Sequence, residues 1–348
     1  MDVETRCLPV GALPYDNLNH ATAMMAKLFS QNPYIALLPN MSDTETLENR
    51  IFNNIPGVEY NNGKLVLSAG TPEHEAGIAA LDKACKSPNL KHLESFSFEA
   101  KFLEKYFHMI KKFNSKNAYV NILGPFTVSQ MLTSKAEEQS IADKKYRKLF
   151  AEAVCVKGLW AIEKIKQACS STAPVVILEE PMLNQLGAVK RQNPGITAEL
   201  VTNLFSNTVE TLKNAGAAVG VQCMGKCDWS VPINAGVDII SFDAYNNPNN
   251  LTIIPDILTE YLKNGGMINW GIVPVVSDSV VKDLTVDYLY KRLSSTIEGV
   301  ILSGVPAGLL YKSALVSVNG DMDKLPVMFS EKALILAIKL GSRLALRG

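Results

Sequence analysis

The sequence predicts an α/β fold, a (β/α)8 TIM barrel built as one domain over residues 1–348. Short apolar runs near residues 8, 36, 120, 177, 219, 239, 270 and 316 alternate with helical patterns, which is typical of this barrel. An open doubly wound sheet is the alternative. The glycine fingerprint that such a sheet carries after its first strand does not follow the first apolar run, so the barrel is favoured.

The N-terminal third predicts two barrel strands and an added ribbon. Residues 5–14 form a first strand, a helix begins after Asp16 or Asn17, and residues 34–38 form a second strand. Residues 58–68 predict a hairpin, because Asn62 and Gly63 suit a tight type I′ turn. With helices over 73–87 and 96–113, this hairpin makes an inserted elaboration over about residues 57–115.

From residue 118 onward, strands and helices alternate regularly. The strand over 118–123 ends at Gly124, where a proline and a short helix follow. The remaining strands are expected at 175–178, 217–221, 237–242, 267–273 and within 299–318. The helices are expected at about 141–169, 197–214, 254–263, 285–297 and 330–345.

Composition excludes several classes of partner. The 34 Lys and Arg residues balance the 34 Asp and Glu residues, so no net field favours nucleic acid or an anionic membrane. No apolar run is long enough to span a bilayer, and the N-terminus lacks the pattern of a signal peptide. We therefore expect a cytoplasmic protein that acts on a small molecule, with its six scattered cysteines reduced.

The polar residues at strand ends are the candidate site, because the carboxyl ends of parallel strands share one mouth. The apolar strand over 217–221 leads into a turn with Gln222, Met224 and Asp228. Carboxylates at such positions often cap the following helix. Glu180 lies between a buried strand and a proline, where a cap is more often Ser, Thr or Asp, so we take it as a candidate for chemistry.

Six short motifs occur in an order that resembles a known family. They are Gly11-Ala12-Leu13-Pro14, Gly124-Pro125-Phe126-Thr127, Glu179-Glu180-Pro181, Gly225 with Asp228-Trp229, Phe242-Asp243-Ala244 and Trp270-Gly271-Ile272-Val273-Pro274. Together they are similar to the catalytic domain of cobalamin-independent methionine synthase, in the barrel group that includes uroporphyrinogen decarboxylase. The resemblance covers essentially the whole chain. It implies a methyl transfer in which a zinc ion at the barrel mouth binds a thiol substrate as thiolate.

The chain departs from that family at each zinc ligand. Gln222 stands at the His position, Met224 at the first Cys position and Asn319 at the loop Cys position. Amide and thioether groups are poor zinc ligands, so tight zinc binding is expected to be lost there. A rebuilt site would use Cys223 and Cys227, but adjacent strand residues point to opposite faces, which turns Cys223 away from Gln222.

Two functions follow from the resemblance. The first is a methyltransferase acting on a small thiol or related acceptor, with the methyl group delivered by a corrinoid or another carrier protein. Its catalytic residues would be Glu180, Asp228 and Asp243, and its substrate-binding residues Leu13, Tyr15, Gln222, Met224, Trp270 and Asn319. The second is a metal-free relative that binds a small molecule or a partner. A decarboxylase-like lyase is a third possibility, but few arginines lie at strand ends, Arg6 being the nearest.

Overall fold

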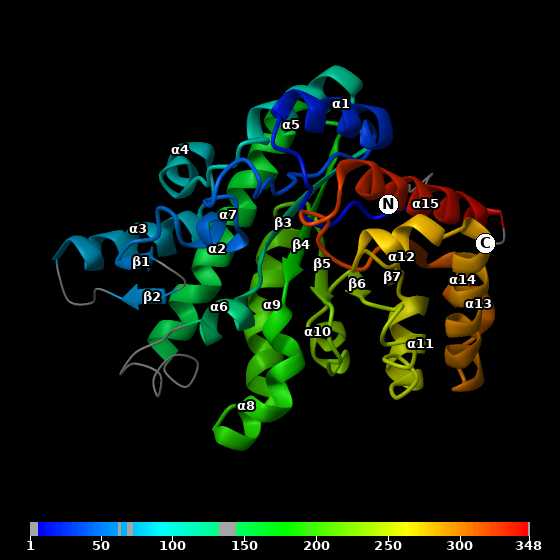
Figure 1. Cartoon of the computed structure of the whole chain (residues 1–348). Coiled ribbons are helices and arrows are strands. Elements are labelled where there is room, and N and C mark those ends of the chain that lie inside the picture. The colour runs from blue at the N-terminus through cyan, green and yellow to red at the C-terminus, as the bar shows by residue number, and fades with distance from the viewer. Residues whose placement is uncertain (1–5, 62–63, 68–71, 132–143, 194, 347–348) are drawn as a thin grey trace.

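A computed structural model describes residues 6–61, 64–67, 72–131, 144–193 and 195–346, and its centre is a parallel sheet (Figure 1). Six strands follow one another across this sheet in chain order. They are β3 (Asn117–Leu123), β4 (Ala173–Glu179), β5 (Ala218–Cys223), β6 (Ile239–Phe242), β7 (Met267–Val273) and β8 (Ala314–Val318). The predicted α/β class with a parallel sheet is therefore confirmed.

A complete eight-stranded barrel is not seen in the described part of the chain. The two strands predicted nearest the N-terminus are each reduced to a single bridge, Cys7 with Val316 on β8 and Tyr34 with Tyr119 on β3. Proline has no N–H to donate to a ladder, which limits pairing in both segments. Four prolines lie in or beside them: Pro9, Pro14, Pro33 and Pro39.

The two N-terminal segments also contact each other. The Leu13 N–H donates to the Leu37 carbonyl at 2.9 Å, and the Tyr34 hydroxyl donates to the Gly11 carbonyl at 3.0 Å. Irregular backbone therefore connects the β8 edge of the sheet with the β3 edge. The described sheet is a curled half-barrel, and these two segments lie where the first two barrel strands were expected.

Helices after the strands supply most of the packing around the sheet (Figure 1). Their boundaries follow sequence signals: α9 begins after the Thr197 cap and buries Val201, Leu204 and Phe205 at helical spacing. The longer ones are α7 (Lys144–Ala168), α9 (Ala198–Asn214), α11 (Pro255–Lys263), α13 (Val286–Leu302) and α15 (Val327–Ala345). The shorter ones are α6 (Pro125–Gln130), η2 (Pro181–Gln185), α8 (Leu186–Gln192), α10 (Ser230–Asn234), α12 (Asp278–Asp283) and α14 (Ala307–Lys312).

The N-terminal region adds a hairpin and helices. Strand β1 (Val58–Asn61) pairs antiparallel with β2 (Lys64–Leu67), with Asn61 opposite Lys64, while the predicted turn residues Asn62 and Gly63 lie outside the described residues. The helix predicted over 96–113 begins later in the structure: α5 (Leu103–Phe113) is capped by Asn114 in a left-handed conformation, and a short 3-10 helix, η1 (Glu94–Phe96), precedes it. The helices are α1 (Leu18–Phe29), α2 (Leu47–Phe52), α3 (Pro72–Lys86), α4 (Leu90–Leu93), η1 (Glu94–Phe96) and α5 (Leu103–Phe113).

The strands of the sheet present two faces of different chemistry. We call the inner face the one that carries three partner positions on neighbouring strands, Gln222, Ser241 and Asn269. We call the outer face the one that carries the next residue of each strand, Cys223, Phe242 and Trp270. No helix in the described part of the chain is long and apolar enough to cross a membrane.

Candidate functional site

A cavity of about 210 Å³ lies at the carboxyl ends of β4 and β5, and we call it the inner pocket. Its lining is mixed: a polar group formed by Arg50, Asn121, Glu179, Gln222 and Asp321, and an apolar group formed by Ile35, Leu37, Leu47 and Met224. The rest of the wall is formed by Gly11, Ala12 and Tyr34 of the N-terminal segments, with Pro181 and Gly320. Enclosure by apolar side chains with a few convergent polar groups is the usual build of a small-molecule site.

Glu179, the last residue of β4, is the central acid of the inner pocket. Its Oε1 accepts a hydrogen bond from Asn121 Nδ2 at 2.6 Å, and its Oε2 accepts one from Gln222 Nε2 at 2.8 Å. Desolvation by burial nonetheless raises the pKa of Glu179 to about 8, against the lowering effect of these two amides. The group can therefore gain or lose a proton near neutral pH.

The charges around Glu179 are mainly negative. Asp321 and Glu180 are the charged groups that act most strongly on it, and both raise its pKa further. Asp321 accepts a hydrogen bond from the Ala12 N–H at 2.7 Å, and burial raises the pKa of Asp321 as well. Among the described residues, no cation affects the pKa of Glu179 as strongly as these two acids do, so no positive charge of comparable effect balances ionised Glu179.

Arg50 is the cation in the lining of the inner pocket. Its guanidinium donates to the carbonyls of Ile35 and Ala36 at 2.9 and 3.0 Å. Burial lowers the pKa of Arg50 to about 10, and the charge of Glu45 partly offsets this. Arg50 therefore donates to backbone carbonyls, and the acid whose charge acts most strongly on it is Glu45 rather than Glu179.

Two buried polar atoms in the lining have no hydrogen-bond partner. They are Asn121 Oδ1, an acceptor, and Arg50 Nε, a donor. Asn121 is 7% exposed and Arg50 is 1% exposed, so bulk solvent has little access to either. A buried polar atom without a partner costs about 1–3 kcal/mol, which a ligand with complementary groups would offset.

The residues predicted from sequence are divided among several places. Gln222 and Met224 line the inner pocket, as does Glu179, which was recognised only as part of a motif. The Leu13 side chain is buried outside that lining, and the Tyr15 hydroxyl donates to Glu331 Oε1 on α15 at 2.6 Å. Trp270 lies on the outer face, with its ring centroid 5.4 Å from that of Phe242.

Glu180 caps a helix on a neighbouring unit of the fold. Its carboxylate accepts hydrogen bonds from the Phe126 N–H at 3.0 Å, the Thr127 N–H at 2.7 Å and the Thr127 hydroxyl at 2.6 Å. These donors belong to the first turn of α6, which Gly124 precedes. A Cβ at Gly124 would lie 2.1 Å from Glu180 Oε1, so the glycine makes room for this contact.

The other two predicted acids are also engaged outside the inner pocket. Asp228 accepts hydrogen bonds from the backbone and the hydroxyl of Ser230 at 3.1 and 2.5 Å. Asp243 accepts from Asn246 N and Nδ2 at 3.0 and 2.6 Å, and from Asn319 Nδ2 at 3.1 Å. Asp243 and Asn319 are therefore brought together, but neither lines the pocket around Glu179.

The residues at the expected zinc positions do not fit zinc. The Gln222 amide is bound at both ends, because Nε2 donates to Glu179 and Oε1 accepts from the Ser241 hydroxyl at 3.0 Å. Asn319 is bound likewise, because its Oδ1 accepts from the Val275 N–H at 3.1 Å. The thioether of Met224 is the remaining group, and it is a poor zinc ligand.

The alternative thiol pair lies on the other side of the strand. The Cys223 thiol donates to the Gly225 carbonyl at 3.9 Å, and the neighbouring Cys227 thiol lowers the pKa of Cys223, while burial raises that of Cys227. Over the residues that the structure describes, no group of three or more His, Cys, Asp and Glu side chains is placed to hold a metal ion.

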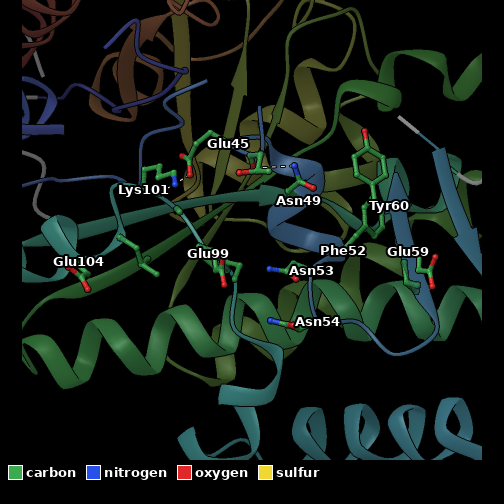
Figure 2. Close-up of a pocket in the computed structure, with 15 residues that line it drawn as sticks. Glu45, Asn49, Phe52, Asn53, Asn54, Glu59, Tyr60, Glu99, Lys101 and Glu104 are labelled. Carbon is green, nitrogen blue, oxygen red and sulfur yellow. Dashed lines mark hydrogen bonds between the residues drawn. The ribbon is translucent and has the colours of Figure 1, made fainter. Parts of the chain in front are cut away.

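A second, larger cavity of about 720 Å³ lies beside α2 and β1 (Figure 2). Its walls include the Phe52 and Tyr60 rings, 5.4 Å apart, and several glutamates. Among these acids, the buried Glu45 has both oxygens engaged, by the N–H groups of Leu38 and Lys101. The inner pocket differs in two ways. It lies at the carboxyl ends of β4 and β5, and its lining includes two buried polar atoms that have no hydrogen-bond partner.

The sequence places Glu179 in a strand-end motif but does not single it out as a catalytic or binding residue, and it gives no indication of Asn121, Arg50 or Asp321 as site residues. Strand alternation was a usable signal for the first: Glu179 is the register partner of Gln222, so those two side chains share a face, and Glu180 does not. Arg50 and Asp321 come from segments far from β4 in sequence, so only tertiary structure brings them to the inner pocket.

Comparisons with known proteins add little to this description. No protein-family model matches the chain. A secreted RxLR effector protein from Phytophthora infestans is 22% identical over 142 residues, which are 41% of this chain and 57% of that protein. A methyltransferase from Methanosarcina mazei superposes with a TM-score of 0.48 and 13% identity, over 97% of this chain and 96% of the other. Similarity at these levels leaves the activity to be inferred from the chain's own residues.

Proposed function

We propose that the chain binds a small molecule carrying an amine in the inner pocket, with the Glu179 carboxylate as the acceptor of its ammonium group. The observation that supports this is the placement of Glu179. Both of its oxygens already accept N–H groups, and its most influential charged neighbours are acids. A desolvated carboxylate without a matched cation favours a ligand that brings one.

The size of the inner pocket limits the ligand. A volume of about 210 Å³ corresponds to roughly seven water molecules at ~30 Å³ each, which suits a molecule about as large as a small amino acid. Ile35, Leu37 and Met224 offer an apolar wall to a short aliphatic body. The unpartnered Asn121 Oδ1 would accept a second N–H from the same ligand.

Binding of an amine should depend on pH in a defined direction. Because the pKa of Glu179 is raised to about 8, the carboxyl is mostly neutral at pH 6 and mostly ionised at pH 9. An ammonium ion binds the ionised form, so affinity should rise about tenfold per pH unit between pH 6 and pH 8. The rise ends where Glu179 is fully ionised or the amine itself loses its proton.

Isothermal titration calorimetry with propylamine, L-alanine and N-propylacetamide tests the proposal. We expect binding of at least one amine and no binding of the neutral amide, and a loss of about 100-fold or more in Glu179→Gln. Glu260→Gln is the matched control, because Glu260 is a surface acid on α11 that pairs with Lys263. Equal binding to wild type and Glu179→Gln, or of amine and amide alike, would overturn the proposal.

Methyl transfer to the bound amine is a second candidate, favoured by the ordered motifs and by a proton acceptor with a pKa near neutral. Glu179 would take a proton from the ammonium, and the freed nitrogen pair would form the bond to the methyl carbon. The electrons of the broken methyl bond would stay on a carrier such as a corrinoid. Incubation with trideuteromethyl cobalamin and the bound amine should give labelled methylamine product in wild type and none in Glu179→Gln.

A further inference from the structure

A row of polar side chains crosses the inner face from one edge of the sheet to the other. Each of the six strands contributes one member: Asn121, Glu179, Gln222, Ser241, Asn269 and Ser317. Ser241, Asn269 and Ser317 have 0% exposure, so the row continues well beyond the inner pocket. Buried polar groups add little to the free energy of unfolding even when they are hydrogen-bonded. Stability therefore does not explain why six polar side chains lie across this face.

The hydrogen bonds of the row have a fixed donor order, in which Asn269 donates to the serine on each side and the bonds from Asn269 to Glu179 all point toward Glu179. The Val318 carbonyl can only accept, and the Ser317 hydroxyl donates to it at 2.7 Å. The Ser317 oxygen is then left as an acceptor, and Asn269 Nδ2 donates to it at 2.8 Å. The second hydrogen of the same amide goes to the Ser241 oxygen, also at 2.8 Å. The Asn269 NH₂ group is therefore fixed between two serines.

The direction carries through to Glu179. Since Ser241 accepts from Asn269, its own hydrogen is free to be donated to Gln222 Oε1, at 3.0 Å. Holding Oε1 in this way orients the Gln222 amide so that Nε2, the donor, faces Glu179. If the amide turned over, Oε1 would face the carboxyl, and only protonated Glu179 could bind it.

We propose that Ser241 is a positioning residue, which through Gln222 holds Glu179 as a hydrogen-bond acceptor and so selects cationic ligands. This inference rests on the proposed function for its ligand but concerns a property of the free protein. Without the Ser241 hydroxyl, Gln222 Oε1 has no donor, and the amide can turn over. Ionised Glu179 would then lose the hydrogen bond from Gln222 Nε2, and protonated Glu179 could donate to Gln222 Oε1 instead. Both changes favour the protonated form, so the pKa of Glu179 should rise.

Carboxyl-carbon NMR of protein labelled at glutamate Cδ measures the titration of Glu179 directly, with its resonance identified by its absence from Glu179→Gln. We expect Ser241→Ala to raise the midpoint by about one pH unit. Ser241→Thr, which keeps the hydroxyl, should restore the wild-type midpoint. Ser330→Ala is the matched control: Ser330 is also a fully buried serine, but its hydroxyl donates to the Val327 carbonyl on α15 at 2.8 Å and takes no part in the row, so its shift should be less than half as large.

The outcomes separate this inference from the proposed function. A raised midpoint in Ser241→Ala, together with no amine binding to wild type, would support the positioning role and overturn the proposed ligand class. Amine binding that depends on Glu179, together with an unchanged midpoint in Ser241→Ala, would overturn the positioning role alone. Equal shifts in Ser241→Ala and Ser330→Ala would also overturn it, because a general loosening of the protein would then explain both.

Discussion

The inner and outer faces of the same strands have different roles, as pairs of adjacent residues show. Glu179 faces a cavity with acids around it, whereas Glu180 binds three donors at the start of α6. Asn269 belongs to a directed polar row, whereas Trp270 packs against Phe242. The outer face contributes ring packing, and the inner face carries the polar row and the cavity that contains Glu179. The predictions below test this division, from the largest expected effect to the smallest.

Trp270→Ala should cost about 3–5 kcal/mol in the free energy of unfolding, because it empties a fully buried ring site. Urea unfolding measures this cost. Trp270→Phe should cost much less, because it keeps an aromatic ring and removes an Nε1–H that has no partner. A substitution that left stability unchanged but abolished ligand binding would instead place Trp270 in the site, contrary to the outer-face assignment.

Glu180→Ala should cost about 2–3 kcal/mol, because the first turn of α6 would lose the acceptor for three buried donors. Glu180→Gln keeps one acceptor oxygen and should fall between the alanine variant and wild type. Urea unfolding at pH 8 compares the three proteins. A loss of amine binding in Glu180→Gln without a loss of stability would show that Glu180 acts on the ligand after all.

Glu179→Gln should stabilise the protein at alkaline pH by about 1–3 kcal/mol, the opposite sign from Glu180→Ala. The folded-state pKa of Glu179 is raised from 4.5 to about 8, so the folded protein holds this proton more tightly than the unfolded chain. The free energy of unfolding of wild type therefore falls as pH rises from 4.5 to 8, because the folded protein must give up this proton. Glutamine does not titrate, so the variant does not undergo this fall.

The glutamine at position 179 can be accommodated because Asn121 Oδ1 is free to accept from its NH₂ after the Asn121 amide turns over. Unfolding at pH 5 and pH 9 checks the sign: the two proteins should differ little at pH 5 and most at pH 9. A variant less stable than wild type at both pH values would show that the carboxylate is structurally required.

Removal of metal should have the smallest effect, because Gln222 and Asn319 have both ends of their amides engaged within the protein. Dialysis against EDTA should leave amine affinity and the unfolding midpoint unchanged. Cys223→Ser is the accompanying control for a site rebuilt on thiols. Stoichiometric zinc that disappears in Cys223→Ser, with amine binding lost alongside, would contradict this account.

Much of the fold was predictable from the sequence, because its signals are local. The apolar runs over 118–123 and 267–273 correspond to β3 and β7, and the helix expected at 197–214 corresponds to α9. The prediction of two strands around residues 8 and 36 was wrong, because neighbouring prolines limit backbone pairing there and leave one bridge in each segment. Burial was predicted there correctly, since Leu8 and Ile35 are in the core.

The site was predictable only in part. Gln222 and Met224 were expected together and do line one pocket, because Gln222 lies near the end of β5 and Met224 follows that strand two residues later. The choice of Glu180 over Glu179 relied on residue type beside a proline, when the register with Gln222 indicates Glu179. No local sequence pattern marks Arg50 on α2 or Asp321 after β8 as site residues. They reach the inner pocket because the N-terminal region and the segment after β8 pack beside the ends of β4 and β5.

The most direct test of the central claim is proton release on amine binding, measured by calorimetry at pH 7 in buffers of different ionisation enthalpy. With a Glu179 pKa of about 8, the free protein holds a proton that an ammonium ligand must displace. The account predicts release of close to one proton by wild type and none by Glu179→Gln. Binding without proton release, or the same release by both proteins, would contradict it.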